Sequence, residues 1–249
     1  LIGSSAIGDS LMAAGGSEYF SQELVINSFD QAAFDSMCAV LVEEELWMCP
    51  TMITNKGAAH RLDLEYTADE RLDYMPVYLT GDWEVDSAMR TNPRAIAYFR
   101  SQKAYYEAVK PLIGKMADRG VNFLAGSDYP NPWCYPGFSL HDEMALMVEG
   151  GMDNLGALQT ATINPAIFME KEDSYGKLGK GKMASMVLLD ENPLENIANT
   201  RSISAVLLRG KVFTRADLDK SLEYVKMNLQ KQFVISPWLK TSIQENGFD

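Results

Sequence analysis

Hydrophobic positions recur along this chain at two spacings, one typical of helices and one typical of strands. Helical spacing marks four stretches, residues 34–42, 92–120, 139–150 and 215–229. Short apolar runs mark four others as strands or strand pairs, residues 46–53, 121–125, 184–189 and 205–213. The pattern predicts an α/β fold in which a long helix separates two early strands and a hairpin lies near the end of the chain.

Residue types at the ends of these stretches predict where the helices begin and end. Ser28, with a glutamine three residues later, fits a capping box at the start of the first helix. Asn92 followed by proline is a strong start for the long second helix, and Pro111 is expected to kink that helix before Gly120 ends it. Ser139 is the predicted cap of the third helix.

The end of the second early strand carries a carboxylate. The helix between residues 46–53 and 121–125 makes a right-handed crossover, so the two strands are expected to be parallel neighbours. Gly126 breaks the second run, and Ser127 and Asp128 follow it. In a parallel α/β barrel, groups at the carboxyl ends of the strands face the active site. Asp128 is therefore a candidate metal ligand or general base, and the alternative is an aspartate that only forms hydrogen bonds at a strand end.

Other polar residues give weaker signals. The loop 129–137 is rich in proline and aromatic rings, which suits either a pocket rim or a packed surface loop. His60 stands beside an arginine and is interpreted as a surface residue, because metal sites need clustered donors. His141 lies on the first turn of a predicted helix and is interpreted as hydrogen-bonded to a neighbouring loop.

Composition excludes several classes of partner. Acidic residues number 34 against 22 basic ones, which gives a formal net charge of -12. This charge argues against nucleic acid or an anionic membrane surface as a partner, since both are bound by clustered Lys and Arg. No apolar run approaches the roughly 18 residues of a membrane-spanning helix. The three cysteines are far apart and form no CxxC motif, so neither a disulfide framework nor a structural zinc site is expected.

The order of several short motifs adds a resemblance to these patterns. Ala125-Gly126-Ser127-Asp128 is followed by SLHDEMALMVEGG at residues 139–151, by ATINPA at 161–166 and by the glycine-punctuated stretch 176–212. In this order the motifs resemble the end of a metal-dependent amidohydrolase barrel, most closely its imidazolonepropionase-like and Xaa-Pro dipeptidase-like branch. Weaker similarity extends over residues 28–120.

The resemblance implies a fold and a division of the chain. Residues 1–175 would form the C-terminal part of a (β/α)8 TIM-type barrel, with its last strands and helices. Residues 176–214 would return to a small β-sandwich that flanks the barrel, and residues 215–249 would form a C-terminal helix and tail.

The resemblance also implies a chemistry, hydrolysis of carbon–nitrogen bonds in a small-molecule substrate by a metal-activated water. The implied cofactor is a divalent metal, with zinc as the first choice. Asp128 matches the family's aspartate on the last barrel strand, which binds the metal and takes a proton from the attacking water. Tyr129, Asn131 and Trp133 are the candidate substrate-binding residues. The sequence leaves open whether the protein forms an oligomer.

The chain departs from the family pattern in its histidines. The family has a His-x-His pair on the first strand and further histidines on later strands, whereas the two histidines of this chain do not fall at those places. Two predicted barrel strands precede the sandwich segment, although a complete barrel takes about 250 residues. We therefore expect the C-terminal part of a longer enzyme. The alternative is a non-catalytic module, derived from the barrel, that binds or scaffolds. A Rossmann-type domain is disfavoured because no GxGxxG follows a strand.

Overall fold

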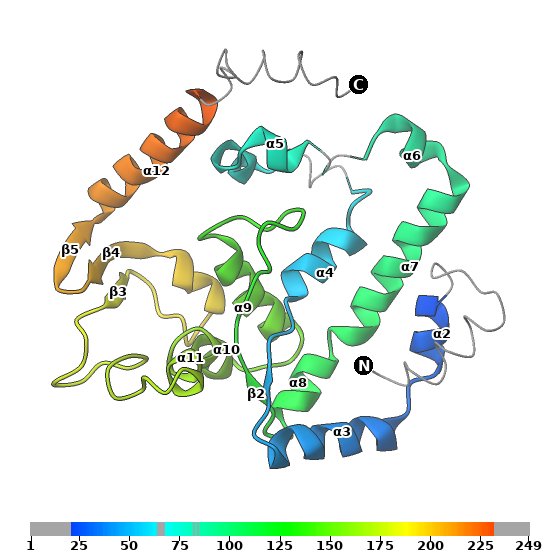
Figure 1. Cartoon of the computed structure of the whole chain (residues 1–249), viewed down its shortest axis with the longest axis horizontal. Coiled ribbons are helices and arrows are strands. Elements are labelled where there is room, and N and C mark those ends of the chain that lie inside the picture. The colour runs from blue at the N-terminus through cyan, green and yellow to red at the C-terminus, as the bar shows by residue number, and fades with distance from the viewer. Residues whose placement is uncertain (1–20, 64–67, 82, 84, 232–249) are drawn as a thin grey trace, which may run out of the picture.

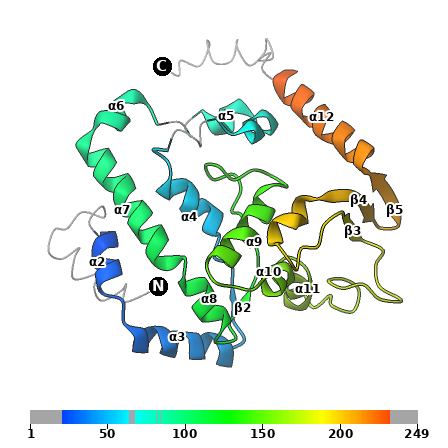
Figure 2. The ribbon, with the colours of Figure 1, turned by 180° about the vertical axis from the view of Figure 1, so that it is seen from behind.

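The computed structural model describes residues 21–63, 68–81, 83 and 85–231. Figures 1 and 2 show the helices α4 and α9 in the centre, the long helix α7 on one side of them, and α12 with the strands β3–β5 on the other side. The elements in chain order are α2 (Ser21–Asn27), α3 (Gln31–Glu43), β1 (Trp47–Met48), α4 (Met52–Ala59), η3 (Glu70–Tyr74), α5 (Val77–Thr80), α6 (Ser87–Thr91), α7 (Pro93–Val109), α8 (Leu112–Ala117), β2 (Asn122–Phe123), α9 (Ser139–Glu149), α10 (Asn154–Thr160), α11 (Ile163–Phe168), β3 (Met186–Leu189), η4 (Ile197–Arg201), β4 (Ile203–Leu208), β5 (Lys211–Thr214) and α12 (Arg215–Lys231).

The two early strands are parallel neighbours, as the crossover predicted. Trp47 pairs with Asn122 and Met48 pairs with Phe123. The predicted strand 46–53 is wrong in its second half, because α4 begins at Met52, where the run continues as the buried first turn of a helix. A short apolar run does not by itself distinguish a buried strand from a buried helix turn. Among the described residues this sheet has two strands, so it does not close a barrel.

Two of the predicted helix caps are wrong, and one is confirmed. Asp30, not Ser28, caps α3, since its side chain accepts a hydrogen bond from the Ala33 N–H. Ser139 lies inside the first turn of α9, where its Oγ accepts the Tyr135 N–H at 2.7 Å instead of capping the helix. Asn92 caps α7 as expected. A neighbouring side chain thus caps α3, whereas Phe138, at the N-cap of α9, makes no side-chain hydrogen bond to the helix.

The predicted kink at Pro111 is a complete break between two helices. α7 ends at Val109 and α8 begins at Leu112, and Gly120 then turns the chain with a φ of +83°. Proline removes a backbone N–H and its ring obstructs the preceding turn, which explains why the helix restarts after it. The break allows α8 to pack against α9 while α7 packs against α4.

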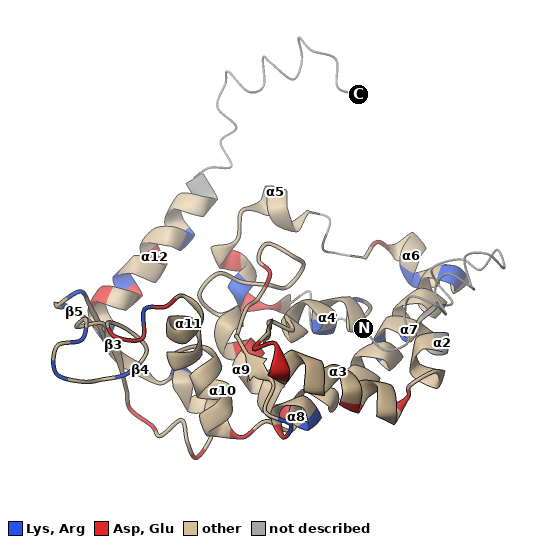
Figure 3. Ribbon diagram, turned by 60° about the horizontal axis from the view of Figure 1, so that its bottom comes forward, with Lys and Arg blue, Asp and Glu red and all other residues tan. Residues whose placement is uncertain are grey.

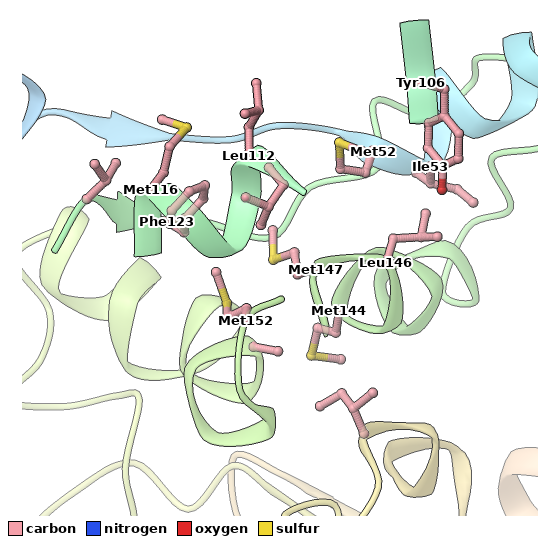
Figure 4. Close-up of a cluster of buried hydrophobic side chains, with 14 of the residues drawn as sticks. Met52, Ile53, Tyr106, Leu112, Met116, Phe123, Met144, Leu146, Met147 and Met152 are labelled. Atoms are coloured by element: carbon pink, nitrogen blue, oxygen red, sulfur yellow. The ribbon is translucent and has the colours of Figure 1, made fainter. Parts of the chain in front are cut away.

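The central elements enclose one main hydrophobic core. Figure 4 shows side chains from α4, α7, α8, β2 and α9 pointing toward one another, with many methionines among them. Unbranched methionine side chains fill irregular space between short elements that meet at several angles. The buried members of this cluster are Phe34, Cys38, Met52, Ile53, Ala59, Tyr106, Leu112, Ile113, Met116, Val121, Phe123, Cys134, Met144, Leu146, Met147, Met152, Ala157 and Ile197.

The C-terminal part forms a separate antiparallel sheet. Its strand order is β3-β4-β5, and β4 and β5 form the predicted hairpin through Arg209 and Gly210, both with positive φ. The helix predicted after it is α12, which contacts β4, β5 and η3. The flanking β-structure is thus one three-stranded sheet in the described residues.

Charged side chains are spread over the molecule. Figure 3 shows Lys and Arg distributed over several helices and the hairpin, with acidic residues between them. Within the described ranges, no helix combines the length and the apolar character that crossing a membrane requires.

Candidate active site at the strand ends

Asp128 lies in the turn that follows β2, where the sequence places it. Its backbone has a φ of +52°, a conformation that aspartate tolerates better than most residues. Its carboxylate is exposed, and Asn131 Nδ2 donates to Asp128 Oδ2 at 2.8 Å and to the Asp128 carbonyl at 2.8 Å. The side chain is therefore oriented by Asn131 and remains accessible from solvent. This geometry allows the role of ligand or base, and it also fits an aspartate that stabilises its own turn.

The loop after Asp128 divides into an exposed part and a buried part. Tyr129 is exposed and Asn131 is half-buried, so both are accessible beside Asp128. Trp133 is 2% exposed and packs with Met75, Trp83 and Tyr135 in a second hydrophobic cluster. The exposed part of the loop therefore fits the interpretation as a pocket rim, and the buried part fits the interpretation as a packed surface loop. The roles of Tyr129, Asn131 and Trp133 in binding substrate remain predictions.

The turn after β1 lies against the turn after β2. Cys49 Sγ is 2.5 Å from the place that a Cβ on Gly126 would take, so any other residue at position 126 would collide with it. Thr54 Oγ1 donates to the Ser127 carbonyl at 3.2 Å and lies 3.5 Å from Cys134 Sγ. The turns at the two strand ends are thus in direct contact with each other.

Sequence reasoning missed Glu143, the buried carboxylate of this region. Glu143 is 0% exposed, and its two oxygens accept the N–H groups of Met52 at 2.9 Å and Ile53 at 2.8 Å. Burial raises the pKa of Glu143 to about 7, although both N–H donors act in the opposite direction. The sequence did contain a signal for this burial. Glu143 stands three and four positions before Leu146 and Met147, so helical spacing puts its carboxylate on the apolar face of the helix.

The two thiols near these turns are not activated. Burial, followed by the charges of Glu143 and Asp128, raises the pKa of the Cys49 thiol. Burial also raises the pKa of Cys134, against the effect of its contact with Thr54. A reactive or metal-binding cysteine needs a lowered pKa, so neither thiol is a good nucleophile or ligand here.

An ion-pair cluster connects the long segment between α4 and α7, called the excursion below, to the start of α9. The Arg71 guanidinium donates to Asp69 at 2.6–3.1 Å and to Asp142 at 2.5 Å, and it lies over the ring of Tyr135. Arg201 donates to the other oxygen of Asp142 at 2.5 Å. Burial opposes the charge of Arg71, but Asp69 and Asp142 together raise its pKa. Because these donors are engaged by protein carboxylates, the cluster is a structural anchor for the excursion.

The two histidines form hydrogen bonds with other side chains. His141 Nδ1 lies 2.9 Å from Thr200 Oγ1 on η4, as the sequence interpretation expected, and burial lowers its pKa. His60, at the end of α4, lies 2.5 Å from Asp63. In the part of the chain that the structure describes, no three His, Cys, Asp or Glu side chains are grouped to hold a metal ion. The described residues therefore do not complete the metal site that the resemblance implies, and the role of Asp128 as a metal ligand remains a prediction.

The chain is an α/β protein with a parallel βα unit, a carboxylate at a strand end and an appended sheet. In parallel α/β barrels the active site lies at the carboxyl ends of the strands. Residues 97–213 match the model of the amidohydrolase family. This confirms the resemblance drawn from the motifs.

Individual proteins agree with the family match but are much longer than this chain. The chain is 27% identical over 146 residues to an imidazolonepropionase from Christiangramia forsetii, and this match covers 57% of the chain and 34% of that protein. The solved structure of a Xaa-Pro dipeptidase with bound methionine covers 78% of the chain with a TM-score of 0.51, at 18% identity, and 42% of its own length is matched. The bottromycin amidohydrolase structure has a TM-score of 0.57 at 22% identity, over 74% of this chain and 40% of that one. These structures show a shared fold over part of an amidohydrolase.

Proposed function

We propose that this chain is the C-terminal part of a metal-dependent amidohydrolase that hydrolyses carbon–nitrogen bonds. The observation that carries the proposal is the family match over residues 97–213, which includes β2, Asp128 and the appended sheet in one order. Since the chain spans about a third of the length of the curated relative, the remaining metal donors belong to the part of the protein that corresponds to the uncovered length. The divalent metal, with zinc as the first choice, is part of this proposal.

In this proposal Asp128 is a metal ligand and the proton acceptor of the completed site. Its exposed carboxylate and its hydrogen bond to Asn131 support that role, because an oriented carboxylate at a strand end is a suitable ligand. Tyr129 and Asn131 lie beside it in the accessible part of the loop, and we propose that they contact the substrate. Trp133 is buried beneath the same loop, so among the three residues it is the weakest candidate for direct contact with the substrate.

The experiment is the D128N substitution in the longest natural form of the protein. Assays would use dipeptides, N-acyl amino acids and cyclic amides, with zinc content measured on the same samples. We expect D128N to lower the turnover of the hydrolysed substrate by about 100-fold and to lower the zinc content. The matched control is D118N, an exposed aspartate just after α8, at the opposite end of β2. Full turnover and full zinc content in D128N would contradict the role of Asp128.

An apolar cavity supports the proposal that more of the barrel covers this chain. A cavity of about 280 Å³ lies between α2, α3, the α7–α8 pair and the end of β1, with Phe34, Met48, Val109 and Met116 among its walls. Met48 and Pro50 line it from β1 and the residues just after it, so further strands and helices added at this edge would fill the cavity.

The cavity gives a second prediction. The chain of 249 residues is expected to enhance the fluorescence of the hydrophobic dye ANS, and the longer natural form is expected to lose most of this enhancement. An A108W substitution would fill the cavity from α7 and reduce dye binding, whereas A104W, on an exposed position of the same helix, would leave it unchanged. Equal dye binding in the short and long forms would mean that the rest of the protein does not cover this face.

The second candidate function is a non-catalytic binding or scaffold module. The observation that favours it is the lack of a grouped donor set among the described residues. The D128N experiment separates the two functions, because a scaffold protein would show no hydrolysis that depends on Asp128 in any form of the chain.

A further inference from the structure

Glu143 is an unusual residue for the interior of this protein. Its carboxylate is completely buried on α9, among apolar side chains such as Met144, Leu146 and Met147. Its two hydrogen-bond donors are the backbone N–H groups of Met52 and Ile53, about 90 residues earlier in the chain. Burying a carboxylate costs free energy unless hydrogen bonds compensate for it, and here the two backbone N–H groups provide that compensation.

The helix α4, whose N–H groups donate to this carboxylate, has no side-chain cap of its own. Thr51, at the N-cap of α4, has a φ of +46° and its side chain makes no capping hydrogen bond. A β-branched residue in this left-handed region is strained and persists when the surroundings hold it. Glu143 accepts the first N–H groups of α4 and thus replaces the missing cap from another helix.

The first turn of α4 is in turn connected to the turn that carries Asp128. Thr54, in the first turn of α4, donates from Oγ1 to the carbonyl of Ser127, the residue next to Asp128. Cys49, before α4, packs on Gly126 in the same turn. The chain of contacts therefore runs from Glu143 through the first turn of α4 to Ser127, the residue just before Asp128.

We propose that Glu143 is the positioning residue of the candidate active site, because its carboxylate holds the first turn of α4 and so fixes the turn that carries Asp128. The role of Asp128 rests on the proposed function, whereas the anchoring of α4 by Glu143 does not.

The test uses the alkylation rates of two buried cysteines in the full chain, measured at pH 8 with iodoacetamide and peptide mass spectrometry. Cys134 is 0% exposed and its Sγ touches Thr54 on α4, whereas Cys38 is 1% exposed on α3 and reports on global opening. In E143A we expect Cys134 to react about tenfold faster or more relative to Cys38, since α4 loses both acceptors. E143Q keeps one acceptor oxygen and should give an intermediate ratio.

The matched control is M147A, which removes another fully buried side chain one turn along α9. M147A opens a cavity in the same core but leaves the carboxylate in place, so the rates of Cys134 and Cys38 should rise together. A selective rise at Cys134 in E143A alone supports the anchor. The same Cys134 to Cys38 ratio in E143A and M147A, or an unchanged ratio in E143A, would overturn it.

Hydrogen exchange tests the second half of the proposal, the effect on the Asp128 turn. The Asn131 N–H donates to the Asp128 carbonyl at 3.1 Å, so peptides covering residues 126–134 report on that turn. E143A should accelerate exchange in these peptides by about tenfold, and M147A should not. Unchanged exchange at 126–134 in E143A would show that Glu143 does not position Asp128. By contrast, D128N with full turnover would refute the proposed function and leave the anchoring of α4 intact.

Discussion

Replacing Gly114 by alanine is expected to destabilise the protein by about 3 kcal/mol, because α8 and α9 touch through their backbones at this glycine. A Cβ at position 114 would lie 2.7 Å from the Gly151 Cα and 2.8 Å from the Gly150 carbonyl oxygen. The Gly114 N–H also donates to that carbonyl at 2.9 Å. Backbone atoms do not move aside as the end of a side chain does, so α8 would have to separate from α9 and open the main core.

The measurement is urea unfolding of G114A beside a matched glycine variant. A Cβ at Gly179 would meet only the flexible side chain of Lys182, at 3.6 Å or more, and its φ is not in the left-handed region. G179A is therefore expected to change the free energy of unfolding by less than about 0.5 kcal/mol. If G114A is equally mild, α8 and α9 do not approach as closely as the structure places them.

The second large effect concerns pH and Glu143. The folded pKa of about 7 lies above the ordinary value of 4.5, so between these values the folded protein keeps a proton that the unfolded chain has lost. The stabilisation is therefore fully present below about pH 4.5 and is lost as the pH rises through about 7. Over this window Glu143 lowers the free energy of unfolding by about 3 kcal/mol.

A difference measurement isolates Glu143 from the other carboxylates. E143Q resembles the protonated side chain in shape but does not titrate, so the stability of wild type minus that of E143Q should fall by about 3 kcal/mol between pH 4.5 and 8. Subtracting the two urea curves at each pH removes the effect of aspartates such as Asp63 and Asp69, whose pKa values are lowered. A difference that grows with pH would mean that the N–H groups of Met52 and Ile53 outweigh burial and hold the carboxylate ionised.

The sequence predicted the parallel strands and the hairpin because both depend on local pattern. An apolar run, a helix and a second run leave one handedness of connection, and Gly210 permits the turn between β4 and β5. The same local reasoning failed at Ser28 and Ser139, since Asp30 is the cap of α3 and the Ser139 Oγ accepts the Tyr135 N–H instead of a helix N–H. It also extended the strand at 46–53 into what is the first turn of α4.

The candidate site was predicted in part. The sequence identified Asp128 from its place after a strand and from the family motifs, and the structure puts Asn131 and Tyr129 beside it. The place of Glu143 on the apolar side of its helix was visible in the sequence, but its partners were not, because the two N–H groups that bind it come from α4, about 90 residues away. Nor did the sequence distinguish Trp133, which is buried under the excursion, from its accessible neighbours in the loop.

The sequence by itself determined the parallel pair β1–β2, the hairpin β4–β5, the resemblance to amidohydrolases and the strand-end position of Asp128, since these follow from periodicity and from motifs in a fixed order. Only the tertiary structure decided how the strand-end turns are held together. That arrangement depends on Gly126 against Cys49, on Thr54 against Ser127 and on a carboxylate brought from α9. Such contacts join residues far apart in the chain, and their energies arise from burial and hydrogen-bond geometry that exist only after folding.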